Sequence, residues 1–368
     1  MTIKKLTRSI IKFYHFLSKN NYPNSLKLEG LKFDIIIHYL TWRCNSRCIT
    51  CNCWQTSPTE QKKEVWNLDN IRKFYSTVKA NYVYLTGGEP SIIPNFREIV
   101  EIIYKTSGAS VSFTTNGLAT KKIEEDLLWL KKRGIIFSLD LSCNGFEQKH
   151  DFSRGIIGNY QKILELINFC QSHKIYFTLS FTAFSFNLDE AIPFIDYWNK
   201  KGVEVTLGIA RFDQRYKINE NFKKDIIDDR DYPRILEKIL KELCEKYPQY
   251  LPQYQLIKKI NNNEKNFPCF GLVKRLVVGP YGEVFPCDGL VDKLYLGNLK
   301  ESDFDFRKFI QSKEDRFKEV FNIIKEKRCQ PCFYITDLLY GINLTLPKKD
   351  IIRILKKRFL VRIKKLFK

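Results

Sequence analysis

Residues 34–51 read DIIIHYLTWRCNSRCITC, an apolar stretch followed by three closely spaced cysteines. The stretch Asp34–Thr41 predicts a buried β-strand, and Cys44, Cys48 and Cys51 follow it with the spacing C-x3-C-x2-C. Three thiolates so close together suit an iron–sulfur cubane, which normally takes four cysteine ligands. With three ligands, one iron keeps an open position for a small molecule. We expect the chemistry of this chain at that open iron.

The spacing alone leaves two other interpretations of these cysteines open. Zinc also binds C-x2-C pairs, but it takes four nitrogen or sulfur ligands. Cys53 would supply a fourth thiolate by proximity. A disulfide within the group is the third interpretation.

A second motif follows another predicted strand. The sequence YVYL at residues 82–85 indicates a buried strand, and it runs into TGGEP at residues 86–90. Gly87 and Gly88 allow the backbone to approach a ligand closely, and Glu89 adds a carboxylate able to accept hydrogen bonds from an ammonium group. By itself, this motif indicates only a turn.

Together the two motifs resemble those of the radical S-adenosylmethionine (SAM) superfamily, over roughly residues 34–210. The resemblance implies that Cys44, Cys48 and Cys51 hold a 4Fe–4S cluster that chelates the amino and carboxylate groups of SAM. An external one-electron donor such as flavodoxin or ferredoxin would reduce this cluster. SAM would then be cleaved to methionine and a 5′-deoxyadenosyl radical, which takes a hydrogen atom from a substrate.

The resemblance also implies roles for residues after the later strands. Asn116 lies in a TNG motif beside the nucleoside, and Arg154 lies in HDFSRG, where its guanidinium fork suits the SAM carboxylate. The cofactor-binding candidates are Gly87, Gly88, Glu89, Asn116 and Arg154, and the catalytic or substrate-contacting candidates are Asp140, Cys143, Arg211 and Asp213. The chain departs from the family at Thr50, where an aromatic residue is common, and at Gly145, which comes later than the usual Asp-Gly.

Predicted strands alternate with predicted helices along the first part of the chain, which is typical of βαβ units and a parallel sheet. The strands are Asp34–Thr41, Tyr82–Thr86, Ser110–Thr115, Ile135–Asp140, Ile175–Thr182 and Val203–Gly208. The helices are Asp69–Ala80, Asn95–Lys105, Lys121–Arg133, Asn159–His173 and Asp189–Lys201. This order predicts an α/β fold, and the resemblance implies a partial (β/α)6 barrel with its site at the carboxyl ends of the strands.

Four further cysteines predict a second cluster. Cys269 and Cys287 lie on either side of two short apolar runs joined by Gly-Pro-Tyr-Gly, which indicates a hairpin, and Cys329 and Cys332 form C-x2-C. Four thiolates would complete a 4Fe–4S cluster, and zinc fits four cysteines equally well. The arrangement resembles the twitch domain, a short relative of the SPASM domain. The resemblance implies an auxiliary cluster that accepts an electron from the substrate radical.

These motifs predict five regions. They are a basic amphipathic N-terminal segment (1–30), the barrel (31–210), connecting or lid helices (211–267), a small cysteine-rich auxiliary-cluster domain (268–340) and a basic amphipathic C-terminal helix (341–368).

The net charge of +21 lies mainly at the two ends of the chain. Residues 1–20 carry five basic side chains and no acidic one, and residues 348–368 carry ten basic and one acidic, so the ends hold 14 of the 21 charges. The apolar positions of the last stretch, among them Ile352, Leu355 and Phe359, recur at helical spacing, which suits an anionic membrane surface. Packing on the barrel is the alternative, and nucleic acid is less favoured because no RNA-reading motif occurs.

Composition and cysteine usage limit the compartment and the class. No run of eighteen apolar residues and no secretory signal occur, and eleven cysteines in such a chain favour metal ligation and free thiols over a disulfide framework. We expect a cytoplasmic protein with peripheral contact at the inner face of the membrane. The four histidines have no metal-ligand spacing and are expected to be structural.

The sequence does not fix the substrate. The basic ends favour a membrane-proximal substrate, lipid-linked or a sugar, and small alcohols remain open. A peptide, as in the enzymes that mature ribosomal peptides, is the alternative. A zinc-binding module that tethers a partner, without catalysis, is the alternative from another class.

Overall fold

The computed structural model describes residues 23–210, 232–262, 269–287 and 294–326. The chain divides into two compact units. The larger unit includes residues 27–210, 271–287 and 294–326, and the smaller includes residues 23–26, 232–262 and 269–270.

The larger unit is built on a nine-stranded sheet with the order β6-β5-β4-β3-β2-β1-β7-β8-β9. The first six strands follow the chain order and are all parallel, as βαβ units require. They are β1 (Lys32–Thr41), β2 (Lys79–Gly87), β3 (Ser110–Thr115), β4 (Phe137–Ser142), β5 (Phe177–Ala183) and β6 (Val205–Ile209). The predicted parallel α/β architecture is confirmed, with structural relatives of the same fold given below.

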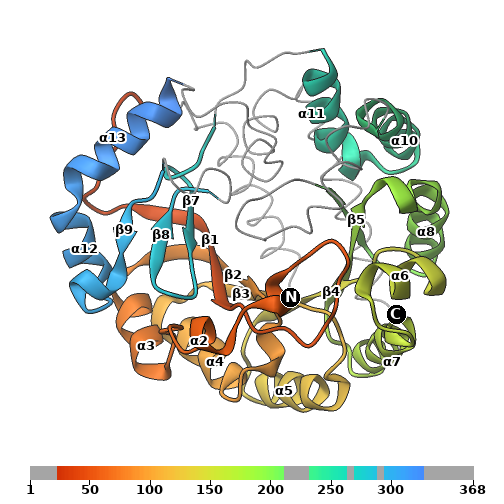
Figure 1. The fold of residues 1–368 in the computed structure, drawn as a ribbon, viewed down its shortest axis with the longest axis horizontal. Coiled ribbons are helices and arrows are strands. Elements are labelled where there is room, and N and C mark those ends of the chain that lie inside the picture. Colours follow the sequence, from red (N-terminus) through yellow and green to blue (C-terminus); the bar gives the residue numbers. More distant parts are fainter. Residues whose placement is uncertain (1–22, 211–231, 263–268, 288–293, 327–368) are drawn as a thin grey trace, which may run out of the picture. The chain divides into compact units, whose positions relative to one another are not determined.

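Helices follow the strands and lie on the outer side of the curved sheet, as Figure 1 shows. They are α3 (Leu68–Thr77), α4 (Phe96–Ser107), α5 (Thr120–Lys132), α6 (Glu147–Arg154), α7 (Asn159–Ser172) and α8 (Leu188–Lys200). In α4 the buried residues Phe96, Ile99, Val100 and Ile103 recur at helical spacing and give one apolar face. Gly108 ends this helix in the left-handed conformation.

The strands separate an apolar outer face from a polar inner face. In β3, Val111, Phe113 and Thr115 are buried, while Ser110, Ser112 and Thr114 alternate with them and are partly accessible. The Phe113 ring meets Phe96 of α4, with 4.9 Å between the ring centroids, so the buried face is the one that packs on the helices. The serine and threonine side chains therefore point into the barrel.

Residues 271–326 continue the same sheet. β7 (Arg275–Val278) pairs in parallel with β1, and β8 (Glu283–Phe285) pairs with it antiparallel as the predicted hairpin. β9 (Gly297–Asn298) completes the edge, followed by η6 (Leu299–Ser302), α12 (Phe306–Ser312) and α13 (Glu314–Lys325). The first strand of the predicted auxiliary domain is thus a neighbour of the strand that leads to the cysteine loop. The five predicted region boundaries stay predictions.

The smaller unit contains α10 (Tyr232–Lys246), η5 (Pro248–Tyr250) and α11 (Leu251–Asn261), as the two helical patterns in this part of the sequence predict. Leu236, Leu240 and Leu243 give α10 a buried apolar stripe. Asn261 of α11 donates to the Pro233 carbonyl of α10 at 3.2 Å, which fixes the two helices against each other.

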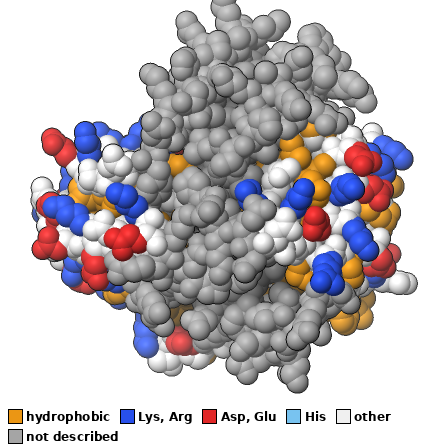
Figure 2. Space-filling model, turned by 90° about the horizontal axis from the view of Figure 1, so that it is seen from above, with side chains coloured by type: hydrophobic (Ala, Val, Ile, Leu, Met, Phe, Trp, Pro, Cys, Tyr) orange, Lys and Arg blue, Asp and Glu red, His pale blue; other side chains and the backbone are white. Residues whose placement is uncertain are grey.

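The surface of the described residues carries both signs of charge, and Figure 2 shows lysine and arginine side chains interspersed with aspartate and glutamate on one face. Both basic ends of the chain lie largely outside the described residues, including the predicted amphipathic stripes. Among the helices described, none is long and apolar enough to cross a membrane.

Candidate active site

The three N-terminal cysteines lie on one loop that begins where β1 ends. Cys44, Cys48 and Cys51 are all partly accessible free thiols. Two backbone hydrogen bonds hold the loop against the end of α6, from Arg47 N to the Arg154 carbonyl and from Ile49 N to the Ser153 carbonyl, both 3.1 Å. The loop is therefore fixed at the carboxyl end of the barrel, where the sequence predicts the site.

Hydrogen-bond donors converge on the sulfur atoms of this loop. Ser46 N donates to Cys44 Sγ at 3.4 Å, and Cys53 N donates to Cys51 Sγ at 3.5 Å. The Ser46 hydroxyl lies 3.2 Å from Cys48 Sγ. Donors at these positions favour thiolates, the form that binds metal.

The thiols differ in how readily they ionise. Hydrogen bonding by Cys53 lowers the pKa of Cys51, whereas burial raises the pKa of Cys44 to about 12. A bound metal would have to displace the Cys44 proton, because a metal-ligating thiol is deprotonated. The set of three sulfurs with donors around them fits the ligand shell of an iron–sulfur cluster.

The zinc and disulfide alternatives gain no support from the geometry. All nine cysteines in the described ranges are free thiols. Among the same residues, no three His, Cys, Asp or Glu side chains gather closely enough to hold a single metal ion. Cys53 is buried, 5% exposed, as a small thiol beside the loop.

The Gly-Gly-Glu turn packs directly on the cysteine loop. Gly88 N donates to the Thr41 carbonyl at 2.7 Å, and Glu89 N donates to the Arg43 carbonyl at 2.8 Å. A Cβ atom on Gly87 would lie 2.3 Å from the Thr41 carbonyl oxygen, and one on Gly88 would lie 2.1 Å from that of Arg43. Both glycines are therefore required for this contact between turn and loop, whatever ligand they also meet.

Glu89 is buried at the centre of this arrangement, 1% exposed. Its Oε1 accepts from Ser91 N at 3.1 Å and its Oε2 from Asn116 N at 2.7 Å. A carboxylate has about four acceptor sites, so capacity remains for an ammonium group. Burial raises the pKa of Glu89, which a cationic ligand would counteract.

Asn116 joins the end of β3 to the cysteine loop. Its Nδ2 donates to Asn45 Oδ1 at 2.8 Å and lies 3.8 Å from Cys44 Sγ, while its Oδ1 accepts from Leu118 N at 2.9 Å. The structure therefore places Asn116, Glu89 and Cys44 together, as the motifs predict for a shared ligand.

Arg154 comes from the end of α6 and reaches the same place. Its Nη1 lies 3.6 Å from Cys48 Sγ. Its Nε is buried and has no hydrogen-bond partner among the described residues. A buried guanidinium nitrogen that lacks a partner fits a carboxylate ligand such as that of SAM.

Asp140 lies inside the barrel, below the cysteine loop. It accepts from Tyr84 Oη at 3.0 Å and from Thr178 Oγ1 at 2.9 Å, side chains of β2 and β5. Thr114 and Ser142 hydrogen-bond nearby, at 3.3 Å. Burial raises the pKa of Asp140, so the interior presents a polar wall with a carboxyl group that gains a proton easily.

The other predicted residues are less informative. Cys143 is fully buried and its Sγ donates to the Gly145 carbonyl at 3.5 Å, which makes it a core thiol with a pKa raised by burial to about 12. Cys269 and Cys287 are partly accessible and belong to different units. Arg211, Asp213, Cys329 and Cys332 lie outside the described residues.

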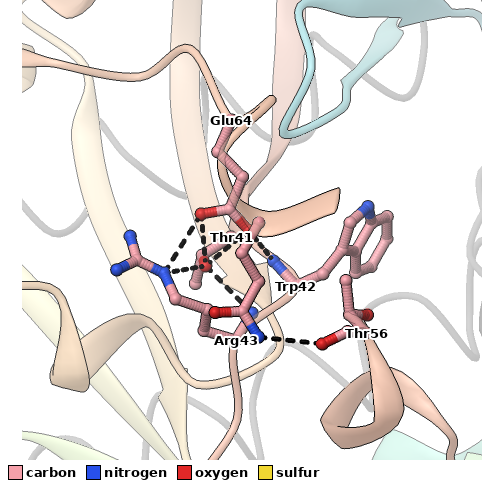
Figure 3. Close-up of polar contacts among 6 residues, drawn as sticks. Thr41, Trp42, Arg43, Thr56 and Glu64 are labelled. Atoms are coloured by element: carbon pink, nitrogen blue, oxygen red, sulfur yellow. Dashed lines mark hydrogen bonds and ion pairs between the residues drawn. The ribbon is translucent and has the colours of Figure 1, made fainter. Parts of the chain in front are cut away.

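The structure adds two residues that the motifs did not single out. Asn144 cross-links the end of β4, because its Oδ1 accepts from Thr182 N at 3.1 Å and its Nδ2 donates to Ser153 Oγ at 3.4 Å. The Asn-Gly pair at 144–145 was the available signal. Glu64 contacts the start of the cysteine loop (Figure 3), and no local pattern marks it.

A cavity of about 660 Å³ opens next to Glu64, and Arg43, Trp66 and Lys300 also line it. None of the candidate cysteines borders it. The convergence of cysteines, Glu89 and Arg154 defines the candidate reaction centre, and this cavity does not.

Comparison with protein families gives two adjacent matches. Residues 39–210 match the Radical SAM superfamily, and residues 269–333 match SPASM, an iron–sulfur cluster-binding domain. The first match covers the barrel strands and the second begins at Cys269.

Individual proteins agree with these matches. AlbA of Bacillus subtilis strain 168, an antilisterial bacteriocin subtilosin biosynthesis protein, is 25% identical over 322 residues, which are 83% of this chain and 67% of AlbA. A GTP 3′,8-cyclase of Staphylococcus epidermidis is 30% identical over 178 residues, 45% of this chain and about half, 51%, of the cyclase. The structure of anSMEcpe with bound AdoMet and a peptide aligns with a TM-score of 0.54 at 17% identity, covering 91% of this chain and 99% of anSMEcpe.

Fold and comparisons define an iron–sulfur enzyme that binds SAM. The chain belongs to the radical SAM superfamily, and it carries a SPASM-type iron–sulfur domain after the barrel. Its cofactors are SAM and 4Fe–4S clusters.

Proposed function

We propose that this chain is a peptide-modifying radical SAM enzyme that removes a hydrogen atom from a peptide substrate. The observation that carries the proposal is the likeness to AlbA, a bacteriocin biosynthesis protein, which extends over 83% of the chain and so includes both the barrel and the SPASM-type domain. The bound peptide in the anSMEcpe structure shows that a chain of this fold can hold one. The peptide therefore replaces the lipid-linked or sugar substrate as the favoured class.

The residues at the loop have separate tasks in this proposal. Cys44, Cys48 and Cys51 would hold the cluster, which when bound supplies the electron that cleaves SAM to methionine and a 5′-deoxyadenosyl radical. Glu89 would accept hydrogen bonds from the SAM amino group. Arg154 would pair with the SAM carboxylate through the nitrogen that lacks a partner among the described residues.

The polar wall inside the barrel is the proposed substrate side. Asp140 faces the interior and is oriented by Tyr84 and Thr178. A carboxylate held there can accept a hydrogen bond from a peptide N–H and orient the peptide before hydrogen transfer. Asp140 is therefore proposed as a substrate-positioning residue.

The auxiliary cluster would receive the electron left on the substrate. Hydrogen-atom loss, followed by loss of one electron to the cluster at Cys269, Cys287, Cys329 and Cys332 and of one proton to solvent, oxidises the peptide by two electrons. An external flavodoxin or ferredoxin would supply the electron that starts each turnover.

The test is co-expression with short peptides encoded beside the gene, followed by mass spectrometry. A peptide lighter by two hydrogens, formed only with intact Cys44, supports the proposal. Transfer of deuterium from a labelled peptide into 5′-deoxyadenosine identifies the abstraction step. A panel of such peptides that neither changes mass nor stimulates SAM cleavage would contradict the proposal.

Small nucleotides are the second candidate class, because the cyclase relative is 30% identical, although that match covers only 45% of the chain. GTP itself is the probe. Deuterium transfer from labelled GTP into 5′-deoxyadenosine would favour this class over peptides.

Membrane contact remains a separate proposal that rests on the sequence of the C-terminal stretch. Ten basic residues in 348–368 would each contribute about 1 kcal/mol near an anionic surface. The chain should sediment with anionic vesicles and lose this binding at high salt or without residues 348–368. Equal sedimentation of the truncated chain would show that the stretch is not responsible.

A further inference from the structure

A short segment before α3, residues 64–66, lies between the β7–β8 hairpin and the cysteine loop, and we call it the strap. Two hydrogen bonds fix it to the hairpin turn. Val65 N donates to the Pro280 carbonyl at 3.0 Å, and Trp66 Nε1 donates to the Gly279 carbonyl at 2.8 Å. Asn70 Nδ2 also donates to the Val65 carbonyl at 2.7 Å, so the strap is held from both sides.

Glu64 extends from the strap to the residues that lead into the cysteine loop, as Figure 3 shows. Its Oε1 accepts from Trp42 N at 2.7 Å, its two oxygens both lie 2.9 Å from Thr41 Oγ1, and its Oε2 accepts from Arg43 Nε at 3.2 Å. The Glu64 side chain is 7% exposed. A nearly buried carboxylate with three separate donors is a fixed contact, unlike an exposed ion pair.

The opposite edge of the same three residues carries the SAM-binding turn. The Thr41 carbonyl accepts from Gly88 N, and the Arg43 carbonyl accepts from Glu89 N. Thr41 to Arg43 therefore lie between Glu64 on one side and the Gly-Gly-Glu turn on the other. A shift of this stretch would move Cys44, the next residue, relative to Glu89.

We propose that Glu64 is a positioning residue that fixes the cysteine loop against the Gly-Gly-Glu turn and couples this register to the β7–β8 hairpin. It touches neither SAM nor the cluster. The inference rests on the proposed roles of Cys44, Cys48 and Cys51 as cluster ligands and of Glu89 as a SAM contact. It adds a connection between the SPASM-type region and the SAM site that the separate motifs do not contain.

The Arg43 ion pair cannot carry this role by itself. The Arg43 side chain is 44% exposed, and exposed pairs contribute little. The bonds to Trp42 N and Thr41 Oγ1 fix backbone and strand end directly. Glu64→Gln keeps one acceptor for Trp42 N but places an amide group against the donors of Thr41 and Arg43, so its effect should be intermediate.

The test uses full-length protein with reconstituted clusters and SAM as the ligand. Variants Glu64→Ala, Glu64→Gln, Thr41→Val and Trp66→Phe are compared for iron content, Tm, Kd for SAM and the change that SAM causes in the EPR spectrum of the reduced protein. The matched control is Glu60→Gln, because Glu60 lies four residues away and its carboxylate caps its own helix, α2 (Pro58–Gln61). Cys44→Ala reports separately on the cluster assignment.

We expect Glu64→Ala to keep its iron and to bind SAM about tenfold more weakly, with a smaller EPR change. A tenfold change equals about 1.4 kcal/mol, close to one hydrogen bond. Glu64→Gln and Thr41→Val should lose less, Trp66→Phe about threefold, and Glu60→Gln nothing. Wild-type affinity and spectrum in Glu64→Ala would overturn the proposal. So would loss of iron and Tm together, since Glu64 would then support the fold in general. Full iron and SAM cleavage in Cys44→Ala would instead contradict the proposed function.

Discussion

The two cysteine regions of this chain differ in how they are assembled. Cys44, Cys48 and Cys51 lie within eight residues on one loop, and backbone hydrogen bonds from β1, α6 and the Gly-Gly-Glu turn hold that loop in place. Cys269 and Cys287 lie on either side of the β7–β8 hairpin, and Cys329 and Cys332 are distant in sequence. The first site is local and can be recognised as a motif, whereas the second depends on tertiary structure.

The largest expected effect separates these regions. Replacing Cys44, Cys48 and Cys51 by alanine should abolish 5′-deoxyadenosine formation, because no cluster remains to reduce SAM. Cys287→Ala should leave SAM cleavage measurable and prevent formation of modified peptide. Chromatography of 5′-deoxyadenosine and mass spectrometry of the peptide check both. Loss of SAM cleavage in Cys287→Ala to the same degree would mean that the regions do not act separately.

A methyl group on the Gly-Gly-Glu turn should also disrupt the first site. A Cβ on Gly88 would lie 2.1 Å from the Arg43 carbonyl oxygen, so Gly88→Ala must displace the cysteine loop. We expect loss of measurable SAM binding by calorimetry. The control is Gly108→Ala, whose Cβ would meet no atom within 4 Å but whose φ is +68°. Left-handed strain there costs about 1–2 kcal/mol of stability and should leave SAM binding unchanged. Equal binding by the two variants would contradict the close contact.

Removing the charge of Glu89 should have a moderate effect. Glu89→Gln keeps the size of the side chain but replaces one acceptor oxygen by an amide, so affinity for SAM should fall about tenfold, or about 1.4 kcal/mol. Glu98→Gln, on α4, is the surface control. Calorimetric titration with SAM measures both. An unchanged Kd in Glu89→Gln would leave this carboxylate with only its structural bonds to Ser91 and Asn116.

The smallest effect concerns His150, which sits away from both cysteine regions. Its Nδ1 accepts from Asn144 N at 3.1 Å, and burial lowers its pKa to about 3. The unfolded chain, with a pKa of about 6.5, then binds the extra proton, so the contribution of His150 to stability is present above pH 6.5 and is lost as pH falls toward 3. The stability gap between wild type and His150→Gln should shrink by about 1.4 kcal/mol from pH 7.5 to 5.5. Anaerobic thermal unfolding at both values measures it, and a constant gap would argue against a neutral His150.

The order of the barrel strands was predictable because each strand and helix has its own pattern. Three strand starts were placed two residues too early, at Ile135, Ile175 and Val203. The reason is a bond back to the preceding helix. Their N–H groups donate to the carbonyls of Leu130, Cys170 and Trp198. Such residues are apolar and buried like strand residues, but they complete the helix end.

The shift at β4 also changes the interpretation of its polar residues. The predicted strand ends at Asp140, whereas β4 extends to Ser142. Asp140 therefore lies within the strand and faces the interior, and Asn144 is the polar residue that follows the strand end. The alternation of a strand fixes the face only after its ends are known.

Contacts between distant segments could not be predicted. Glu64 meets donors 21 to 23 residues earlier in the chain, and Trp66 meets Gly279 more than two hundred residues later. Neither contact has a sequence pattern. The motif residues Cys44, Glu89 and Asn116 were identifiable, but the residues that fix their register were not.

The most direct test of the central claim is iron and sulfide analysis of anaerobically prepared protein and of its Cys44→Ala, Cys48→Ala, Cys51→Ala triple variant. Wild type should carry about eight irons per chain, and the triple variant about four fewer, since one cubane holds four. A triple variant with wild-type iron content would contradict the assignment of these three cysteines to a cluster.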